Sequence, residues 1–285
     1  MDILYGKDVV KAITKEINLE LGKITSYIPH LAIIRVGENP DDIAYERGAV
    51  NRCEKIGIRC TVFNYPLDIG DQAFKFAFSD INNDEDVDGI LLLRPLPRHI
   101  DEKGITEMIN PIKDIDGISP INVAKVFSGD ESGFAPCTAE AVMEMISYAQ
   151  IDLSGKRATV VGRSMVIGKP VAMMLMKKNA TVTICHTRTV DMEATCKNAE
   201  ILVAAAGRSK MINDKYVTKG AYVFDVGINV DEQGNMSGDV DIDDISSIAT
   251  LCTPVPRGVG TVTTSVLVKN VIKAARIRRE RNDNV

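Results

Sequence analysis

The sequence lacks the features that mark a membrane, secreted or metal-binding protein. No apolar run approaches the roughly 18 residues that a membrane span needs, and residues 1–10 carry charges and lack the apolar core of a signal peptide. The six cysteines form no Cys-x-x-Cys pair and the three histidines do not cluster with them, so a zinc site is not expected. We therefore expect a cytoplasmic protein with reduced thiols.

The chain also has no excess of basic residues. Acidic residues outnumber basic ones by 39 to 34, which gives a formal net charge of −5 and no reason to expect a nucleic acid as partner. An apolar content of 45% and a charged content of 26% are typical of a soluble globular protein. With 285 residues, the chain is long enough for one large domain or two ordinary ones.

The second half of the chain begins with a turn of the kind that binds phosphate. Residues 158–161 form a short apolar strand that ends at Gly162, and Gly168 and Pro170 open a helix. Such a corner leaves room for a pyrophosphate and points free N–H groups at it. The spacing Gly162-x-Ser164-x-x-x-Gly168 is not the G-x-G-x-x-G pattern, so taken alone it also fits an ordinary strand-to-helix turn.

Three further strands are expected after this corner. Residues 180–185, 199–206 and 221–226 are apolar, and each run passes into small or polar residues at its C-terminal end. Doubly wound sheets bind their ligands at that end of the strands. The pattern predicts a Rossmann-type doubly wound parallel sheet over residues 138–263.

The residues after the second of these strands favour NADP over NAD. An acidic residue is expected there in a protein that binds the ribose 2′-hydroxyl of NAD, but residues 186–189 read His-Thr-Arg-Thr. Thr187 and Arg188 suit a 2′-phosphate, with Arg163 in the first turn as a further cation, because arginine pairs with phosphate bidentately. The alternative is that Arg188 is a solvated loop charge.

The first 120 residues also alternate helices and strands, which predicts a second parallel sheet. Turn residues crowd residues 110–138, which we interpret as a long ordered loop or a domain junction. The expected helices cover residues 7–22, 41 or 42 to 55, 70–82, 101–109, 138–150 and 263–280, and the expected strands cover 31–36, 60–65 and 89–94.

Several segments occur together in the order and spacing of one protein family. They are the Gly162 turn, Lys113-Asp114-Ile115-Asp116-Gly117, Pro136-Cys137-Thr138, Thr253-Pro254-Val255-Pro256-Arg257-Gly258-Val259-Gly260, Tyr45 after Gly37-x-x-Pro40, and Asp88-Gly89-Ile90 before Pro95-Leu96-Pro97. From about residue 5 to residue 275, the chain resembles the bifunctional methylenetetrahydrofolate dehydrogenase/methenyltetrahydrofolate cyclohydrolase family.

The resemblance implies two α/β domains with a cleft between them. Residues 1–137 with 264–285 would form a folate-binding catalytic domain closed by the C-terminal helix, and residues 138–263 an NADP-binding domain. The implied protein is a cytoplasmic homodimer that binds tetrahydrofolate derivatives and oxidises 5,10-methylenetetrahydrofolate by hydride transfer to NADP. The family's second reaction adds water to the methenyl product and gives 10-formyltetrahydrofolate.

The resemblance also assigns site residues. Asp116 is expected to hold the pterin by paired hydrogen bonds and Tyr45 to stack on a flat ring. The alternatives are a carboxylate that caps its own turn and a half-buried helix tyrosine. The other expected contacts are Pro254, Gly258 and Gly260 for the substrate, and Gly162, Arg163, Ser164, Gly168, Thr187, Arg188 and Ile228 for the cofactor.

The sequence departs from the family at the residues for water addition. That step needs a proton-handling group beside the methenyl cation, which in the family is a lysine one helical turn after the tyrosine, with a glutamine partner. Here the two positions are Ala49 and Leu93. We therefore expect weak or absent cyclohydrolase activity. Lys113 is the one nearby candidate for a replacement, whereas Arg52 faces correctly but is a poor base.

Further departures leave two alternative functions open. Asp42, Arg94 and Arg257 place charges where the family has a serine, an apolar residue and a glycine. Such changes fit an NADP-dependent oxidoreductase that acts on another pterin or on a small acid. The second alternative is a non-catalytic folate- or nucleotide-binding relative. The intact phosphate-binding turn at Gly162 argues against it. Hydride transfer depends only on how the substrate and the nicotinamide are placed, so a chain that binds both can catalyse it.

Overall fold

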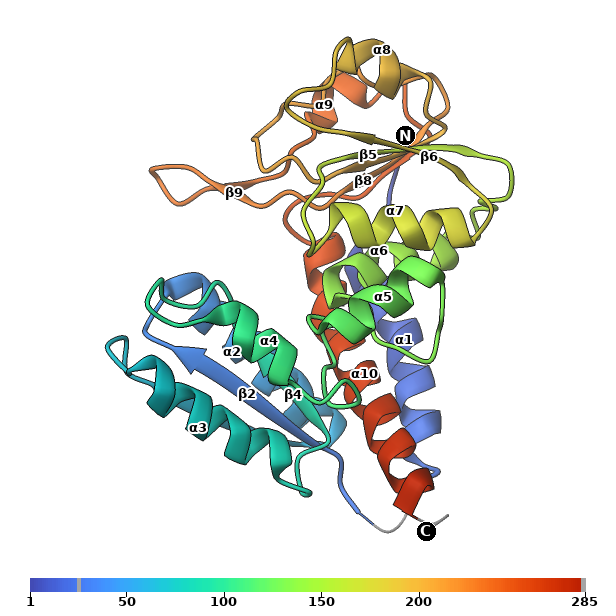
Figure 1. Cartoon of the computed structure of the whole chain (residues 1–285). Coiled ribbons are helices and arrows are strands. Elements are labelled where there is room, and N and C mark those ends of the chain that lie inside the picture. Colours follow the sequence, from blue (N-terminus) through green and yellow to red (C-terminus); the bar gives the residue numbers. More distant parts are fainter. Residues whose placement is uncertain (25–26, 283–285) are drawn as a thin grey trace. The chain divides into compact units, whose positions relative to one another are not determined.

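The computed structural model describes residues 1–24 and 27–282 of the chain. The chain divides into two compact units, Met1–Ala12 with Thr138–Thr263 and Ile13–Cys137 with Thr264–Val285, each built on a parallel sheet (Figure 1). The first 12 residues, assigned from the sequence to the folate-binding domain, group with the other unit, where β1 (Asp2–Ile3) pairs with β11 (Leu251–Cys252). The last residues of that predicted domain, 283–285, lie outside the described part.

The first unit contains a six-stranded parallel sheet with the strand order β1-β11-β8-β7-β5-β6. After β6 the chain crosses back to the other side of β5, so the strand order reverses between β5 and β7. Doubly wound sheets bind their ligands outside the carboxyl ends of the strands at this reversal, and the predicted Rossmann-type sheet is confirmed. Its central strands are β5 (Arg157–Val161), β6 (Thr181–Cys185), β7 (Ile201–Ala204) and β8 (Tyr222–Asp225).

Helices and one hairpin complete this unit. The last four residues of β5 and all of β7 are buried, as expected for parallel strands that are covered on both faces. A hairpin of β9 (Asn229–Val230) and β10 (Met236–Ser237) extends away from the sheet (Figure 1). The helices are α6 (Cys137–Tyr148), α7 (Gly168–Lys177), α8 (Met192–Lys197) and α9 (Ile242–Ile245).

The second unit contains a three-stranded parallel sheet with the order β3-β2-β4. All seven residues of the central strand, β2, are buried, and helices lie on both sides of it (Figure 1). The strands are β2 (His30–Val36), β3 (Arg59–Tyr65) and β4 (Gly89–Leu92), and the helices are α1 (Gly6–Leu21), α2 (Pro40–Ile56), α3 (Asp71–Asn83), α4 (Glu102–Met108), α5 (Pro120–Ser128) and α10 (Val259–Asn282). Both α1 and α10 continue into the first unit.

Residues 110–138, predicted as a long ordered loop or a domain junction, contain a helix, α5, and end where the two compact units divide. Ser119 caps it, because its Oγ accepts a hydrogen bond of 3.2 Å from the Asn122 N–H, and Pro120 fills the first turn. Gly129, with φ of 74°, ends it. Ser119 and Pro120, two of the residues that suggested turns, are therefore the start signal of a short helix.

Two other helix starts differ from the predictions. α2 begins at Pro40, and its cap is Asn39, whose side chain accepts from the Asp41 N–H at 2.9 Å. Asp41 and Asp42, where the helix was predicted to begin, lie in its first turn, where carboxylates interact favourably with the helix dipole. α10 begins at Val259, earlier than the predicted residue 263.

Two general properties concern the whole described chain. None of its described helices combines the length and the apolar character needed to cross a bilayer. All six cysteines lie in the described part, and no disulfide joins any of them.

A buried ion pair fastens α10 to the three-stranded sheet. The Asp88 carboxylate, just before β4, accepts from Arg278 Nη1 at 2.8 Å and from the His30 backbone N–H at 3.0 Å. The Asp88 side chain is 1% exposed and that of Arg278 is 14% exposed. Removing one partner of such a pair leaves the other charge buried and uncompensated.

Asp88→Asn should therefore lower the free energy of unfolding by about 3–5 kcal/mol. The control is Asp86→Asn, which removes an ion pair with Arg59 whose side chains are 45% and 62% exposed and should cost less than about 1 kcal/mol. Urea unfolding followed by circular dichroism measures both changes. Equal losses in the two variants would show that the Asp88 pair is not a major anchor of α10.

Candidate functional site

The turn after β5 has the tight geometry that phosphate binding requires. Gly162 adopts φ of 132°, and a Cβ there would lie 2.2 Å from the Ala205 carbonyl oxygen. A Cβ on Gly168 would lie 2.2 Å from the carbonyl oxygen of Gly162. Glycine is therefore required at both positions, because the start of α7 and the loop after β7 both approach the Gly162 backbone.

The first turn of α7 is organised by Ser164. Its Oγ accepts from the Ile167 N–H at 3.1 Å and, more weakly, from the Gly168 N–H at 3.5 Å, and its carbonyl oxygen accepts from the Lys169 N–H at 3.0 Å. The side chains of Arg163 and Ser164 are exposed. The structure thus brings these predicted cofactor residues together at a helix N-terminus, which favours an anion.

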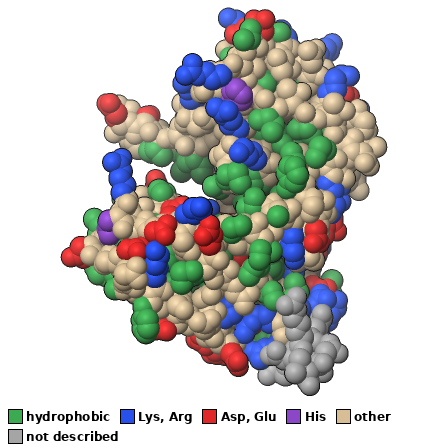
Figure 2. Space-filling view, in the orientation of Figure 1, with side chains coloured by type: hydrophobic (Ala, Val, Ile, Leu, Met, Phe, Trp, Pro, Cys, Tyr) green, Lys and Arg blue, Asp and Glu red, His purple; other side chains and the backbone are tan. Residues whose placement is uncertain are grey.

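Residues 186–189 form a closed turn directly after β6. The His186 N–H donates to Thr189 Oγ1 at 2.9 Å, the Thr189 N–H donates to the His186 carbonyl at 2.8 Å, and the Arg188 N–H donates to His186 Nδ1 at 3.1 Å. Thr187 and Arg188 remain exposed. Figure 2 shows Lys and Arg side chains gathered beside a histidine of this unit. A rigid turn with an exposed hydroxyl and guanidinium suits a phosphate group.

Two buried aspartates at the carboxyl ends of the strands were not predicted as site residues. Asp225, the last residue of β8, and Asp239, just after β10, are both 0% exposed. Burial raises the pKa of Asp225 to about 7, although the backbone N–H groups that it accepts from stabilise its charged form and lower the pKa. Ile228, a predicted cofactor contact, lies between them in sequence and is 60% exposed. The sequence signal for Asp239 is the acidic segment Asp239-Val240-Asp241, which follows the predicted strand 221–226.

Of the predicted substrate contacts of this unit, Pro254 and Gly258 lie between β11 and α10, and Gly260 lies in the first turn of α10. A Cβ on Gly258 would lie 2.2 Å from the Pro254 carbonyl oxygen, whereas one on Gly260 would meet only the Ile228 side chain, at 3.9 Å. Arg257 adopts φ of 78°, a left-handed conformation that favours glycine. This angle explains physically why glycine is the expected residue there.

In the other unit, the two remaining predicted substrate residues lie close together. Tyr45, on α2, and Asp116 are both half-buried. The Asp116 carboxylate accepts from the Cys137 backbone N–H at 2.8 Å, which fixes its orientation. Burial raises the pKa of Asp116, and burial together with the nearby Cys137 and Asp116 raises the pKa of Tyr45.

Ala49 and Leu93, the two positions predicted to replace the family's proton-handling residues, are buried and apolar. Ala49 is 0% exposed, one helical turn after Tyr45, and Leu93, directly after β4, is 6% exposed. Arg94 is next in the chain, and its Nη1 lies 3.4 Å from Glu102 Oε1. Its positive charge also opposes the rise in the pKa of Asp116. Neither Ala49 nor Leu93 supplies a titrating group.

The two cations considered as replacements have structural partners. Lys113 Nζ donates to the carbonyl oxygens of Asn82 at 2.8 Å and Asp84 at 2.5 Å, at the C-terminal end of α3. Burial lowers the pKa of Lys113 to about 8, and the Arg278 charge adds to this effect. Arg52 Nη2 donates to Thr14 Oγ1 of α1 at 2.6 Å. Lys113 therefore serves as a helix cap.

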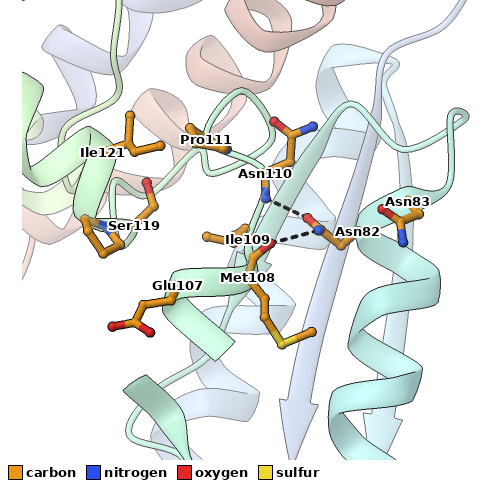
Figure 3. A pocket seen from close by; sticks show the side chains of 10 residues that line it. Asn82, Asn83, Glu107, Met108, Ile109, Asn110, Pro111, Ser119 and Ile121 are labelled. Carbon is orange, nitrogen blue, oxygen red and sulfur yellow. Dashed lines mark hydrogen bonds between the residues drawn. The ribbon is translucent and has the colours of Figure 1, made fainter. Parts of the chain in front are cut away.

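A separate pocket of about 360 Å³ lies where α3 and α4 end and α5 begins (Figure 3). The Asn82 side chain crosses it, donating to the Met108 carbonyl at 3.0 Å and accepting from the Asn110 N–H at 2.8 Å. None of the predicted catalytic or substrate residues lines this pocket. Within residues 1–24 and 27–282, no three His, Cys, Asp or Glu side chains gather as a metal site would require.

A doubly wound parallel sheet with a glycine turn after β5, in a chain with a second α/β unit, defines a dinucleotide-binding α/β protein. Comparisons with known families are more specific. Residues 4–116 match the catalytic domain of tetrahydrofolate dehydrogenase/cyclohydrolase, and residues 136–279 match the NAD(P)-binding domain of the same family. The chain belongs to the tetrahydrofolate dehydrogenase/cyclohydrolase family, as the sequence resemblance indicated.

Individual relatives agree with this assignment over nearly the whole chain. The bifunctional protein FolD of Clostridium kluyveri is 49% identical over 276 residues, which cover 96% of this chain and 97% of the relative. The crystal structure of the FolD enzyme of Campylobacter jejuni has a TM-score of 0.94 at 38% identity, covering 98% and 99% of the two chains. That of Trypanosoma brucei, described as complexed with NADP cofactor and inhibitor, has a TM-score of 0.90 at 33% identity, covering 96% and 97%.

The close approach at the first turn leads to a direct test. Gly168→Ala should weaken dinucleotide binding by about tenfold or more, because the added Cβ forces α7 away from the Gly162 carbonyl and misplaces the N–H groups of its first turn. The control is Gly70→Ala in the other unit, where φ is −68° and a Cβ meets nothing within 4 Å. Isothermal titration calorimetry with NADP and with NAD gives the dissociation constants, and an unchanged value for Gly168→Ala would contradict the assignment of the turn.

Proposed function

We propose that the protein oxidises 5,10-methylenetetrahydrofolate to 5,10-methenyltetrahydrofolate by hydride transfer to NADP. The main support is the glycine turn after β5. Gly162 and Gly168 let the loop after β7 and the start of α7 approach this turn closely, as in a pyrophosphate-binding turn. Hydride transfer requires the reacting carbon to be placed near the nicotinamide and needs no acid or base of its own. Loss of a proton-handling lysine therefore leaves this reaction possible.

On the folate side, Asp116 and Tyr45 are the proposed substrate residues. A carboxylate with one backbone N–H bond keeps acceptor capacity for the adjacent donors of a pterin. The charge of Asp116 contributes to the raised pKa of Tyr45, so the two side chains are near each other. We propose that one ring system contacts both. Pro254, Gly258 and Gly260 are also proposed as substrate contacts. A homodimer is the proposed assembly, supported by β3, which forms an edge of its sheet with no further strand paired to it in the described residues.

The proposed cofactor is NADP because the turn after β6 offers Thr187 and Arg188 and no carboxylate. The Trypanosoma brucei relative is described with NADP, which supports the same choice. A guanidinium and a hydroxyl favour a 2′-phosphate, whereas the ribose 2′-hydroxyl of NAD calls for an acid at this place.

Arg188→Ala should raise KM for NADP by about tenfold, because a charge-assisted contact with the 2′-phosphate is lost. KM for NAD should stay within about twofold of the wild type, since NAD has no such phosphate. Lys197→Ala, an exposed charge at the end of α8, is the control and should change neither value. Initial rates of methylenetetrahydrofolate oxidation with each cofactor measure the effect. A wild type that prefers NAD, or equal changes for both cofactors, would refute the role of Arg188.

We also propose that cyclohydrolase activity is weak or absent. The support is chemical, since water addition needs a group that takes and returns a proton. Ala49 and Leu93 have none, and the ammonium of Lys113 is held by two carbonyls at the end of α3. The methenyl product would then be hydrolysed by solvent or by another catalyst.

Purified protein should therefore hydrolyse methenyltetrahydrofolate no faster than buffer, as followed by the absorbance of the methenyl compound. Ala49→Lys combined with Leu93→Gln should restore measurable hydrolysis, because it supplies a titrating amine and its partner. Ala49→Met with Leu93→Gln fills the same space without an amine and should remain inactive. Rapid hydrolysis by the wild type would mean that another residue has taken over the proton transfer.

A further inference from the structure

One buried carboxylate collects three successive backbone N–H groups of the loop after β7. Asp239 Oδ2 accepts from Ala206 at 2.5 Å and from Gly207 at 2.9 Å, and its Oδ1 accepts from Arg208 at 2.8 Å. Successive N–H groups that converge in this way form a concave site that normally suits a bound anion. Here the chain's own carboxylate fills it, so these groups are not available to a cofactor phosphate.

The same carboxylate also fixes the segment after β8. Its Oδ1 accepts from Asn229 Nδ2 at 2.9 Å, and Gly227 packs so closely that a Cβ there would lie 2.2 Å from the Asp239 carboxyl group. Ile228 lies between these two contacts and is 60% exposed. Asp239 therefore holds the backbone on both sides of an exposed apolar side chain.

A second aspartate holds Asp239 in place. Asp225 Oδ1 accepts from the backbone N–H groups of Gly227 and Asp239, both at 3.0 Å, and its Oδ2 accepts from that of Val240 at 2.9 Å. All these residues belong to the unit with the six-stranded sheet. The two carboxylates thus connect the ends of β7 and β8 to the segment that follows β10.

The loop that Asp239 holds lies at the reversal of strand order. The Ala205 N–H donates to the Val161 carbonyl at 2.8 Å, and a Cβ on Gly162 would collide with the Ala205 carbonyl. The loop after β7 therefore borders the glycine turn directly. Ligands of doubly wound sheets lie in the crevice at this point.

We propose that Asp239 is a positioning residue of the cofactor site, which sets both the loop 205–208 and Ile228 against the bound dinucleotide without touching it. Both of its carboxylate oxygens already accept two hydrogen bonds each, and the residue is fully buried, so neither oxygen is available to the ligand. The identity of the ligand as NADP rests on the proposed function. The role of Asp239 rests on the contacts of its carboxylate.

The first test is Asp239→Asn. Whichever way the amide turns, an NH₂ group replaces an oxygen that accepts two N–H donors, so the loop and Ile228 must shift. The dissociation constant for NADP, measured by calorimetry, should rise by about tenfold or more. KM for NADP should rise with it.

The matched control is Asp114→Asn in the other unit. Asp114 is also 0% exposed and accepts three N–H groups, from Ile118, Ser119 and the Asn122 side chain. Both variants should lower Tm, but Asp114→Asn should leave the dissociation constant for NADP unchanged. If Asp239→Asn lowers Tm and binds NADP like the wild type, Asp239 has only a structural role and the proposal is wrong.

A milder variant covers the case in which Asp239→Asn does not fold. Asn229→Ala removes one donor from Asp239 Oδ1 and should weaken NADP binding by about threefold; an unchanged affinity would count against the proposal. If the wild type binds NAD in place of NADP, the proposed cofactor is wrong, and the same comparisons with NAD decide the role of Asp239.

Discussion

The close backbone contact among three segments at the reversal of strand order is the constraint on which the cofactor site depends. The turn at Gly162 touches both the loop after β7, at Ala205, and the first residue of α7, Gly168, with no space for a side chain at either glycine. Because the contact is made by backbone atoms, it places the N-terminus of α7 against the sheet with little freedom. A binding surface for an anion follows from that placement, since it is made of N–H groups whose direction the backbone determines.

The two reactions of the family make different physical demands. Hydride transfer depends on holding two rings in contact, which rigid backbone and a few oriented side chains can do. Hydration depends on a side chain that changes its protonation state at the right atom. Around Tyr45, the structure offers an oriented carboxylate at Asp116 but buried apolar groups at Ala49 and Leu93. The ammonium of Lys113 donates to two carbonyls at the end of α3, so its withdrawal from there would cost stability.

Much of this architecture could be predicted from local sequence patterns, because apolar runs and glycines reflect burial and backbone angle residue by residue. The central strands, the glycine turn and the stop of α2 at Gly57 are of this kind. α5 was missed because Ser119 and Pro120 also occur in turns, and only the hydrogen bond to Asn122 shows that they start a helix. Asp225 and Asp239 were missed for another reason. Their donors lie in segments far apart in the chain, so no window of sequence contains the pattern. The unusual angle at Arg257 was equally hidden, since nothing about arginine predicts a positive φ.

The reversal of strand order thus contains two sets of converging N–H groups with different uses. At the start of α7, Ser164 accepts from the N–H groups of Ile167, Gly168 and Lys169 without adding a charge, and the exposed Arg163 lies next to it in the chain. After β7, Asp239 occupies the set completely. A carboxylate inside the second set adds negative charge on that side of the crevice, which disfavours a phosphate there and favours the α7 side. The internal anion therefore makes the loop after β7 unsuitable for the phosphates of the proposed dinucleotide and favours the α7 side for them.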